Sequence, residues 1–117
     1  MTLEEFRQAL MEALTRHLPG SSVTMMESRG ITLTCRAELD ADTFVAIYFN
    51  ALTGKTSYAL VHHSERVAGY DNYRFWHCHP MGRSGQHVPC AEPMPEEAIT
   101  ELATVSARLH LVPENEH

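Results

Sequence analysis

Histidines gather in one part of this sequence. Five of the eight histidines in the 117-residue chain lie between positions 62 and 87. Imidazole ordinarily titrates near neutral pH, so it can accept and donate protons there, and its neutral form binds transition metals. His77 and His79 flank Cys78, and in an extended segment both imidazoles would lie on one face. We therefore expect any chemistry within residues 62–90.

Two further potential metal ligands follow this histidine pair. His87 and Cys90 are spaced so that a returning loop could bring them to His77 and His79. Tetrahedral zinc takes four nitrogen or sulfur ligands of this kind. The doubled Cys-x-x-Cys or the His-Glu-x-x-His context of well-defined zinc motifs is absent from the sequence. A zinc module on these four residues is therefore one alternative.

The same histidines suit acid–base catalysis without a metal or other cofactor. In RNA cleavage one histidine removes the 2′-hydroxyl proton, a second histidine or a tyrosine protonates the leaving oxygen, and an arginine stabilises the charge on the phosphorane. The candidates for these roles are His77, His79 and His87, with Tyr70 and Tyr73 as alternative acids and Arg66, Arg74 and Arg83 as phosphate ligands. Metal-independent cleavage of an RNA substrate is the leading hypothesis.

Asp71 and Asn72 precede the histidine pair in a segment that reads as a tight turn. Side chains of these types often accept hydrogen bonds from nearby backbone amides in turns. Asp71 is also a candidate site residue, because its carboxylate could orient a histidine through the second ring nitrogen. A third hypothesis is a non-catalytic interaction protein, in which the histidines only order the loop.

The order of these short motifs resembles a known family. Asp71-Asn72, His77-Cys78-His79-Pro80 and His87-Val88 are followed by a helix starting at Pro95. This order is similar to that of the TumE-type toxins of bacterial and archaeal toxin–antitoxin pairs, and the resemblance covers about the last half of the chain. It implies a short antiparallel sheet before a closing helix, ribonuclease activity and an antitoxin partner.

Composition restricts where such a protein would act. The formal net charge of −6 would repel RNA at long range, so RNA binding would need a local basic patch. The chain holds no apolar run of the roughly 20 residues that cross a membrane, and Glu4 and Glu5 do not suit a signal peptide. Three cysteines favour reduced thiols. We expect a cytoplasmic protein with no membrane partner; the oligomeric state stays open.

The hydrophobic pattern predicts one α+β domain over residues 1–112 and a frayed tail over 113–117. A capping box at Thr2 and Glu5 begins a helix over about residues 3–17, and Pro95 begins a second that ends near residue 110. About four antiparallel strands are expected near residues 22–27, 31–39, 43–49 and 56–61, the last running on toward residue 69 with or without a break. A long histidine-rich loop is expected over residues 71–95.

Overall fold

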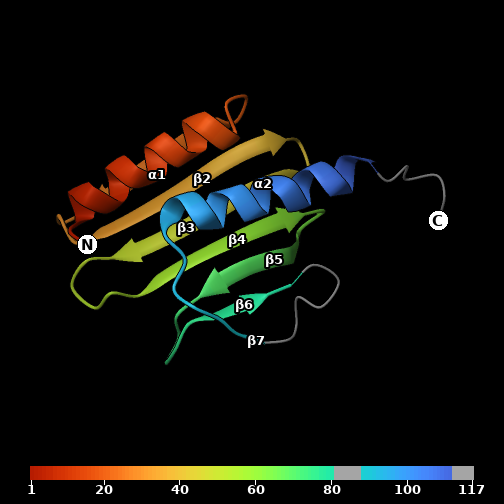
Figure 1. The fold of residues 1–117 in the computed structure, drawn as a ribbon. Coiled ribbons are helices and arrows are strands. Elements are labelled where there is room, and N and C mark those ends of the chain that lie inside the picture. The colour runs from red at the N-terminus through yellow and green to blue at the C-terminus, as the bar shows by residue number, and fades with distance from the viewer. Residues whose placement is uncertain (81–87, 112–117) are drawn as a thin grey trace.

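The computed structural model describes residues 1–80 and 88–111, in which two helices cover one antiparallel sheet (Figure 1). The elements are α1 (Leu3–His17), β1 (Ser22–Ser28), β2 (Thr32–Asp40), β3 (Thr43–Asn50), β4 (Thr56–His62), β5 (Glu65–Asp71), β6 (His77–His79), β7 (Val88–Pro89) and α2 (Pro95–Leu111). Neighbouring strands pair in chain order from β1 to β7. The predicted α+β class, with a helix at each end and an antiparallel sheet between, is confirmed.

Both helices begin where the sequence predicted. The Thr2 hydroxyl accepts a hydrogen bond from the Glu5 amide, and the Glu5 carboxylate accepts one from the Thr2 amide, which completes the capping box of α1. Pro95 occupies the first position of α2, and acidic residues follow it in the first turn, where they complement the positive end of the helix. Local chemistry therefore defines both helix starts before any packing contributes.

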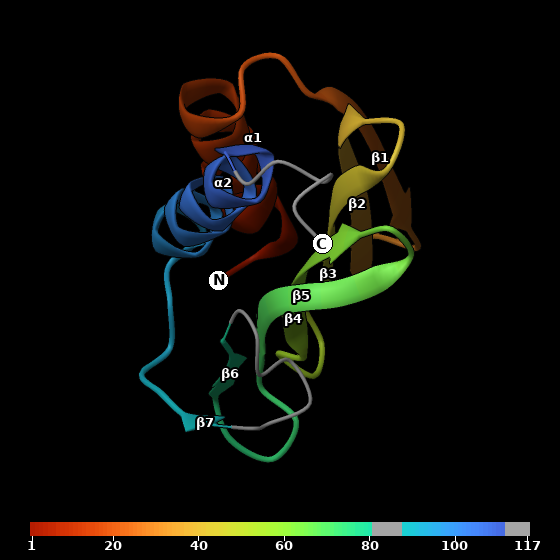
Figure 2. The same ribbon diagram turned by 90° about the vertical axis from the view of Figure 1, so that its right-hand side faces the viewer.

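The core lies between the helices and one face of the sheet (Figures 1 and 2). On β2 the predicted alternation holds, because Leu33, Cys35 and Ala37 are buried while the residues between them are exposed. From α1, the Phe6 ring stacks on the Phe49 ring of β3 with their centroids 4.2 Å apart. Burying an apolar side chain of this size contributes about 1.5–3 kcal/mol, so this layer holds the helices on the sheet.

The predicted number of strands is wrong, because the described residues form a sheet of seven strands rather than four. β4 does not run on but turns back into β5 through His63 and Ser64, which take φ values of 52° and 67°. Such two-residue turns usually use Asn-Gly, so a His-Ser pair carried no turn signal. β6 and β7 have only three and two residues, and they lie within the stretch predicted as loop.

Gly69 lets β5 approach β4 closely. A Cβ atom at this position would lie 2.4 Å from the carbonyl oxygen of Tyr58, which is far inside normal contact. Gly69 pairs with Ala59 on one side and with His79 of β6 on the other. The glycine therefore sits at the junction that carries β6, and with it the histidine pair, onto the edge of the main sheet.

Some sequence expectations concern other parts of the chain. Within residues 1–80 and 88–111, neither helix is long and apolar enough to cross a membrane. The expected frayed tail, His87 and Arg83 lie outside the described residues.

Candidate metal-binding site

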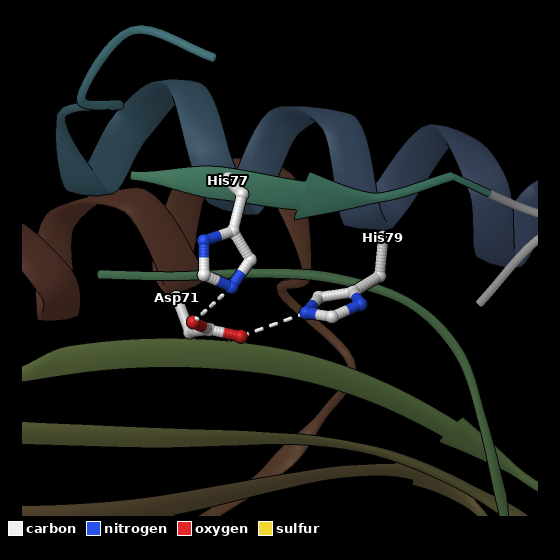
Figure 3. A group of neighbouring side chains, drawn as sticks. All are labelled: Asp71, His77 and His79. Carbon is white, nitrogen blue, oxygen red and sulfur yellow. Dashed lines mark hydrogen bonds and ion pairs between the residues drawn. The ribbon is translucent and has the colours of Figure 1, made fainter. Parts of the chain in front are cut away.

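The β5–β6 pairing brings three predicted site residues together (Figure 3). Asp71 pairs directly with His77, and Gly69 pairs with His79, so all three functional side chains lie on the same face of the sheet. Figure 3 shows the two imidazoles extending from β6 toward the Asp71 carboxylate. The three-residue strand β6 brings His77 and His79 together, as their spacing predicted, and His87, the third histidine expected to converge with them, lies outside the described residues.

One carboxylate bridges the two imidazoles. Oδ1 of Asp71 lies 2.7 Å from Nε2 of His77, and Oδ2 lies 2.7 Å from Nε2 of His79. The two rings are 5.6 Å apart between centroids and inclined at 72°. The three donor atoms all lie within 4.8 Å of one another. In the described part of the chain, no other group of three or more His, Cys, Asp or Glu side chains brings its donor atoms this close together.

The backbone defines which nitrogen of His77 faces the carboxylate. Nδ1 lies 2.9 Å from the carbonyl oxygen of Phe75. A carbonyl can only accept a hydrogen bond, so Nδ1 carries a proton. Histidines that bind metals commonly donate their second N–H to a carbonyl or carboxylate in this way, which orients the ring. His77 is therefore held with Nε2 directed at the group formed with Asp71 and His79.

The site is buried but keeps a charged carboxylate. His77 is 4% exposed and His79 is 1% exposed, whereas Asp71 is half-buried. Burial alone would raise the pKa of Asp71, but hydrogen bonds from His79 and from the Tyr73 amide, together with the nearby charge of His77, outweigh it and hold that pKa below its usual value. Asp71 is thus an anion at neutral pH, which is the form that binds cations.

Asn72 ties the end of β5 to the turn before β4. Its Oδ1 accepts a hydrogen bond of 2.8 Å from the Thr56 amide, and its Nδ2 donates one of 2.8 Å to the Gly54 carbonyl. Asp71 Oδ1 accepts a further bond of 3.2 Å from the Tyr73 amide. The side-chain-to-backbone contacts predicted for Asp71 and Asn72 are confirmed, and they hold the carboxylate in place.

The predicted arginines lie in different places. Arg74 lines an open groove of about 530 Å³ that Asp71 and His77 also line. Arg66 pairs with Val61 near the opposite end of β5, five residues from Asp71, which corresponds to about 15 Å along a strand. The structure therefore brings Arg74 to the site and leaves Arg66 far from it.

Cys90 lies apart from the histidine pair. Its amide donates to the Trp76 carbonyl, which places it with Cys78 on the face of β6 opposite to His77. Burial, followed by a hydrogen bond with Cys78, raises the pKa of Cys90 to about 11. Because its side chain lies on the other face of β6 from His77 and His79, Cys90 does not fit the ligand role that its spacing suggested.

Tyr70 is likewise separated from the acid–base candidates. It pairs with Tyr58 and Cys78, so it lies on the face of β5 opposite to Asp71. Burial raises its pKa to about 12. Tyr73, by contrast, is exposed and lines the groove with Asp71.

A second histidine group lies at the other end of β4, and the sequence did not predict that its members meet. His62 and His63 are in ring contact with centroids 4.0 Å apart, and His110 of α2 lies 6.1 Å from His62. His110 Nε2 lies 2.7 Å from Oδ2 of Asp40, and its Nδ1 lies 2.8 Å from the Ser106 carbonyl. Only the long-range packing of α2 on the sheet brings His110 here, and no local pattern signals it.

Comparisons with known proteins return no match: no family, no curated protein and no solved structure is significantly similar to this chain. The resemblance to TumE-type toxins, the RNA substrate and the antitoxin partner therefore stay predictions, as does the cytoplasmic location. The functional argument depends on the geometry of Asp71, His77 and His79.

Proposed function

We propose that this protein binds a divalent transition metal of the zinc class through Asp71 Oδ, His77 Nε2 and His79 Nε2. The observation that carries the proposal is the convergence of these three donor atoms within 4.8 Å in a buried position. Two imidazoles and one carboxylate are a ligand set that zinc and iron(II) sites use. The predicted zinc module is thereby revised: Asp71 replaces Cys90 as a ligand.

The present distances are close to those that a metal requires. Zinc–nitrogen and zinc–oxygen bonds of about 2.0–2.1 Å in a tetrahedron place neighbouring ligand atoms about 3.3 Å apart. The Asp71 oxygens lie 2.7 Å from their imidazole partners, so a metal would replace the two bridging protons and widen these contacts by about 0.6 Å. It would also set the two imidazole nitrogens, which lie within 4.8 Å of each other, about 3.3 Å apart. Side-chain rotation can supply such a shift without moving the strands.

Within residues 1–80 and 88–111 the site has three protein ligands and an accessible side, and His87, which the sequence also suggested as a ligand, lies outside these residues. Asp71 and His77 line the open groove of about 530 Å³. Structural zinc sites usually close with four protein ligands, whereas catalytic sites keep one position for water or substrate. With three ligands from the described residues, the groove is the side from which a water or substrate would reach the metal.

Metal-free RNA cleavage receives weaker support from the geometry. A general acid or base must reach the proton it transfers, but His77 already has contacts at both ring nitrogens and is 4% exposed. His79 is 1% exposed. Neither ring presents a nitrogen to a phosphodiester, although Arg74 lies close enough to serve such a substrate.

Zinc titration of chelator-stripped protein tests the proposal. We expect one zinc ion per chain by calorimetry, and His79→Ala or Asp71→Asn should weaken binding by more than about 100-fold. His110→Ala and Asp40→Asn are matched controls, because they change the same residue types at the other end of β4, and they should bind zinc like the wild type. Circular dichroism should show that each variant is folded. Equal zinc binding by folded wild-type and His79→Ala proteins would reject the site.

A further inference from the structure

The groove beside the proposed metal site is lined by two cationic side chains, although the protein as a whole is acidic. The chain has nine lysines and arginines and a net charge of −6. Two of those nine, Lys55 and Arg74, line the groove that reaches Asp71 and His77. Neither makes a salt bridge with any residue in the part of the chain that the structure describes. Both are exposed, so their charge is available to a ligand.

Two exposed aromatic rings accompany these cations. Tyr73 is 65% exposed and Phe75 is 57% exposed, and both line the same groove. The guanidinium of Arg74 lies over the Tyr73 ring, 5.5 Å from its centroid. The Phe75 ring packs edge-on to His77, with centroids 5.3 Å apart. Aromatic side chains with this much exposure are available to stack on a planar ligand.

The backbone at Arg74 is held in a strained conformation. Its φ of +71° lies in the left-handed region, which is unfavourable for a residue with a Cβ atom. Strain of this kind persists where surrounding contacts impose it, and it is enriched at binding sites. Here the anchors are the bonds of Asn72 to Thr56 and Gly54 on one side and the start of β6 on the other.

We infer that this groove binds a small oxyanion, a phosphate or carboxylate carried on a planar ring, next to the metal. The inference rests on the proposed metal site, because a divalent ion beside one carboxylate leaves a net positive charge at the floor of the groove. Arg74 and Lys55 would hold the anionic group, and Tyr73 and Phe75 would contact the ring. Small size follows from the groove volume of about 530 Å³, which lies in the range of about 300–1,000 Å³ that small-molecule sites have.

Calorimetry on zinc-loaded protein tests this inference with phenyl phosphate, benzoate and inorganic phosphate as probes. The zinc content is measured in the same samples. We expect phenyl phosphate to bind more tightly than inorganic phosphate, and Arg74→Gln to weaken phenyl phosphate binding at least tenfold with unchanged zinc content. Benzoate binding more tightly than phenyl phosphate would assign the anion as a carboxylate. Lys55→Gln should weaken binding several-fold.

Matched variants separate charge from stacking. Arg29→Gln is the control for Arg74→Gln, because Arg29 is also an exposed arginine with positive φ, 55°, in the β1–β2 turn away from the groove. It should leave binding unchanged. Tyr73→Leu with Phe75→Leu should abolish the advantage of phenyl phosphate over inorganic phosphate, while inorganic phosphate still binds.

The possible failures are distinguishable. Zinc-loaded wild-type protein that binds none of the three probes, or an Arg74→Gln variant that binds them like the wild type, would overturn the inference and leave the metal site standing. Wild-type protein that binds no zinc at any zinc concentration would reject the proposed function itself. Binding of a single-stranded RNA oligonucleotide with steep salt dependence, without binding of phenyl phosphate, would overturn the small-molecule inference in favour of RNA.

Discussion

The two histidine groups lie at opposite ends of β4 and are built from the same residue types. At one end the Asp71 carboxylate contacts two imidazoles that are almost fully buried. At the other end the Asp40 carboxylate contacts one, and the side chains of His110 and Asp40 are 47% and 41% exposed. Counting histidines does not distinguish the groups, but convergence and burial do.

The difference arises from how each group is assembled. Adjacent strands in register hold Asp71 and both of its partners, so three donor atoms point to one place. His110 instead comes from the last turn of α2 and reaches Asp40 across a helix–sheet junction, while His62 is directed to Thr43 through a bond of 2.8 Å. The first arrangement is suited to binding a metal, and the second to fastening the end of a helix.

The largest expected effect is on stability without metal. Asp71→Ala removes the acceptor of two buried imidazoles, which should lower the free energy of unfolding by about 3–5 kcal/mol. Asp40→Ala removes a solvent-exposed ion pair and should cost less than about 1 kcal/mol. Urea unfolding in excess chelator measures both. Equal losses would mean that the two groups are energetically alike.

Zinc should stabilise only through the Asp71 group. A ligand that binds the native state alone, at 100 times its dissociation constant, adds about 2.7 kcal/mol, which should raise the Tm by about 10 °C in a chain of this size. The rise should vanish in His77→Ala and persist in His110→Ala, as measured by calorimetric melting with and without zinc. A rise in Tm that depends on His110 would show that zinc binds at the other end of β4, away from Asp71.

Gly69→Ala should damage one end of the sheet only. The added Cβ would meet the Tyr58 carbonyl oxygen at 2.4 Å, and relieving such overpacking typically costs about 1–3 kcal/mol. Because Gly69 pairs with His79, zinc affinity should fall as well. Gly20→Ala is the control, since nothing lies within 4 Å of its added Cβ. An unchanged zinc affinity in Gly69→Ala would show that β6 is positioned without this close approach.

Acid should release the Asp40 contact gradually. The pKa of Asp40 is lowered by its bond from the Asp42 amide and by His110. A carboxyl with a depressed native pKa stabilises the fold above its unfolded pKa of about 3.9, and this contribution is lost as the pH falls through the lower native value. The Tm difference between wild type and Asp40→Asn should therefore shrink between about pH 5 and pH 2. A difference that grows on acidification would contradict this assignment.

The parts of the fold with local signals were predictable. The capping box of α1, Pro95 at the start of α2 and the alternation along β2 each depend on neighbouring residues, and each prediction holds. The turn between β4 and β5 at His63 and Ser64 was not predicted. The paired strands, rather than a local preference of these residue types, impose the positive φ there. β6 has only three residues, which are too few to distinguish a strand from a loop by hydrophobic pattern.

The candidate site was predicted only where its signal is local in the sequence. The spacing of His77 and His79 indicated a shared face, and a two-residue period is a local property. Spacing alone could not show that Asp71 is a third ligand, because that depends on the register of β5 against β6. Nor could it show that Cys90 faces the other side of β6, or that Arg66 lies near the far end of β5.

X-ray absorption spectroscopy of the zinc-loaded protein tests the central claim most directly. The account predicts a first shell of nitrogen and oxygen atoms alone at about 2.0–2.1 Å, with an outer-shell pattern of imidazole rings that weakens in His77→Ala. It predicts the same spectrum for wild type and Cys90→Ser. A sulfur shell at about 2.3 Å, or an absence of imidazole scattering, would show that zinc is not bound by Asp71, His77 and His79.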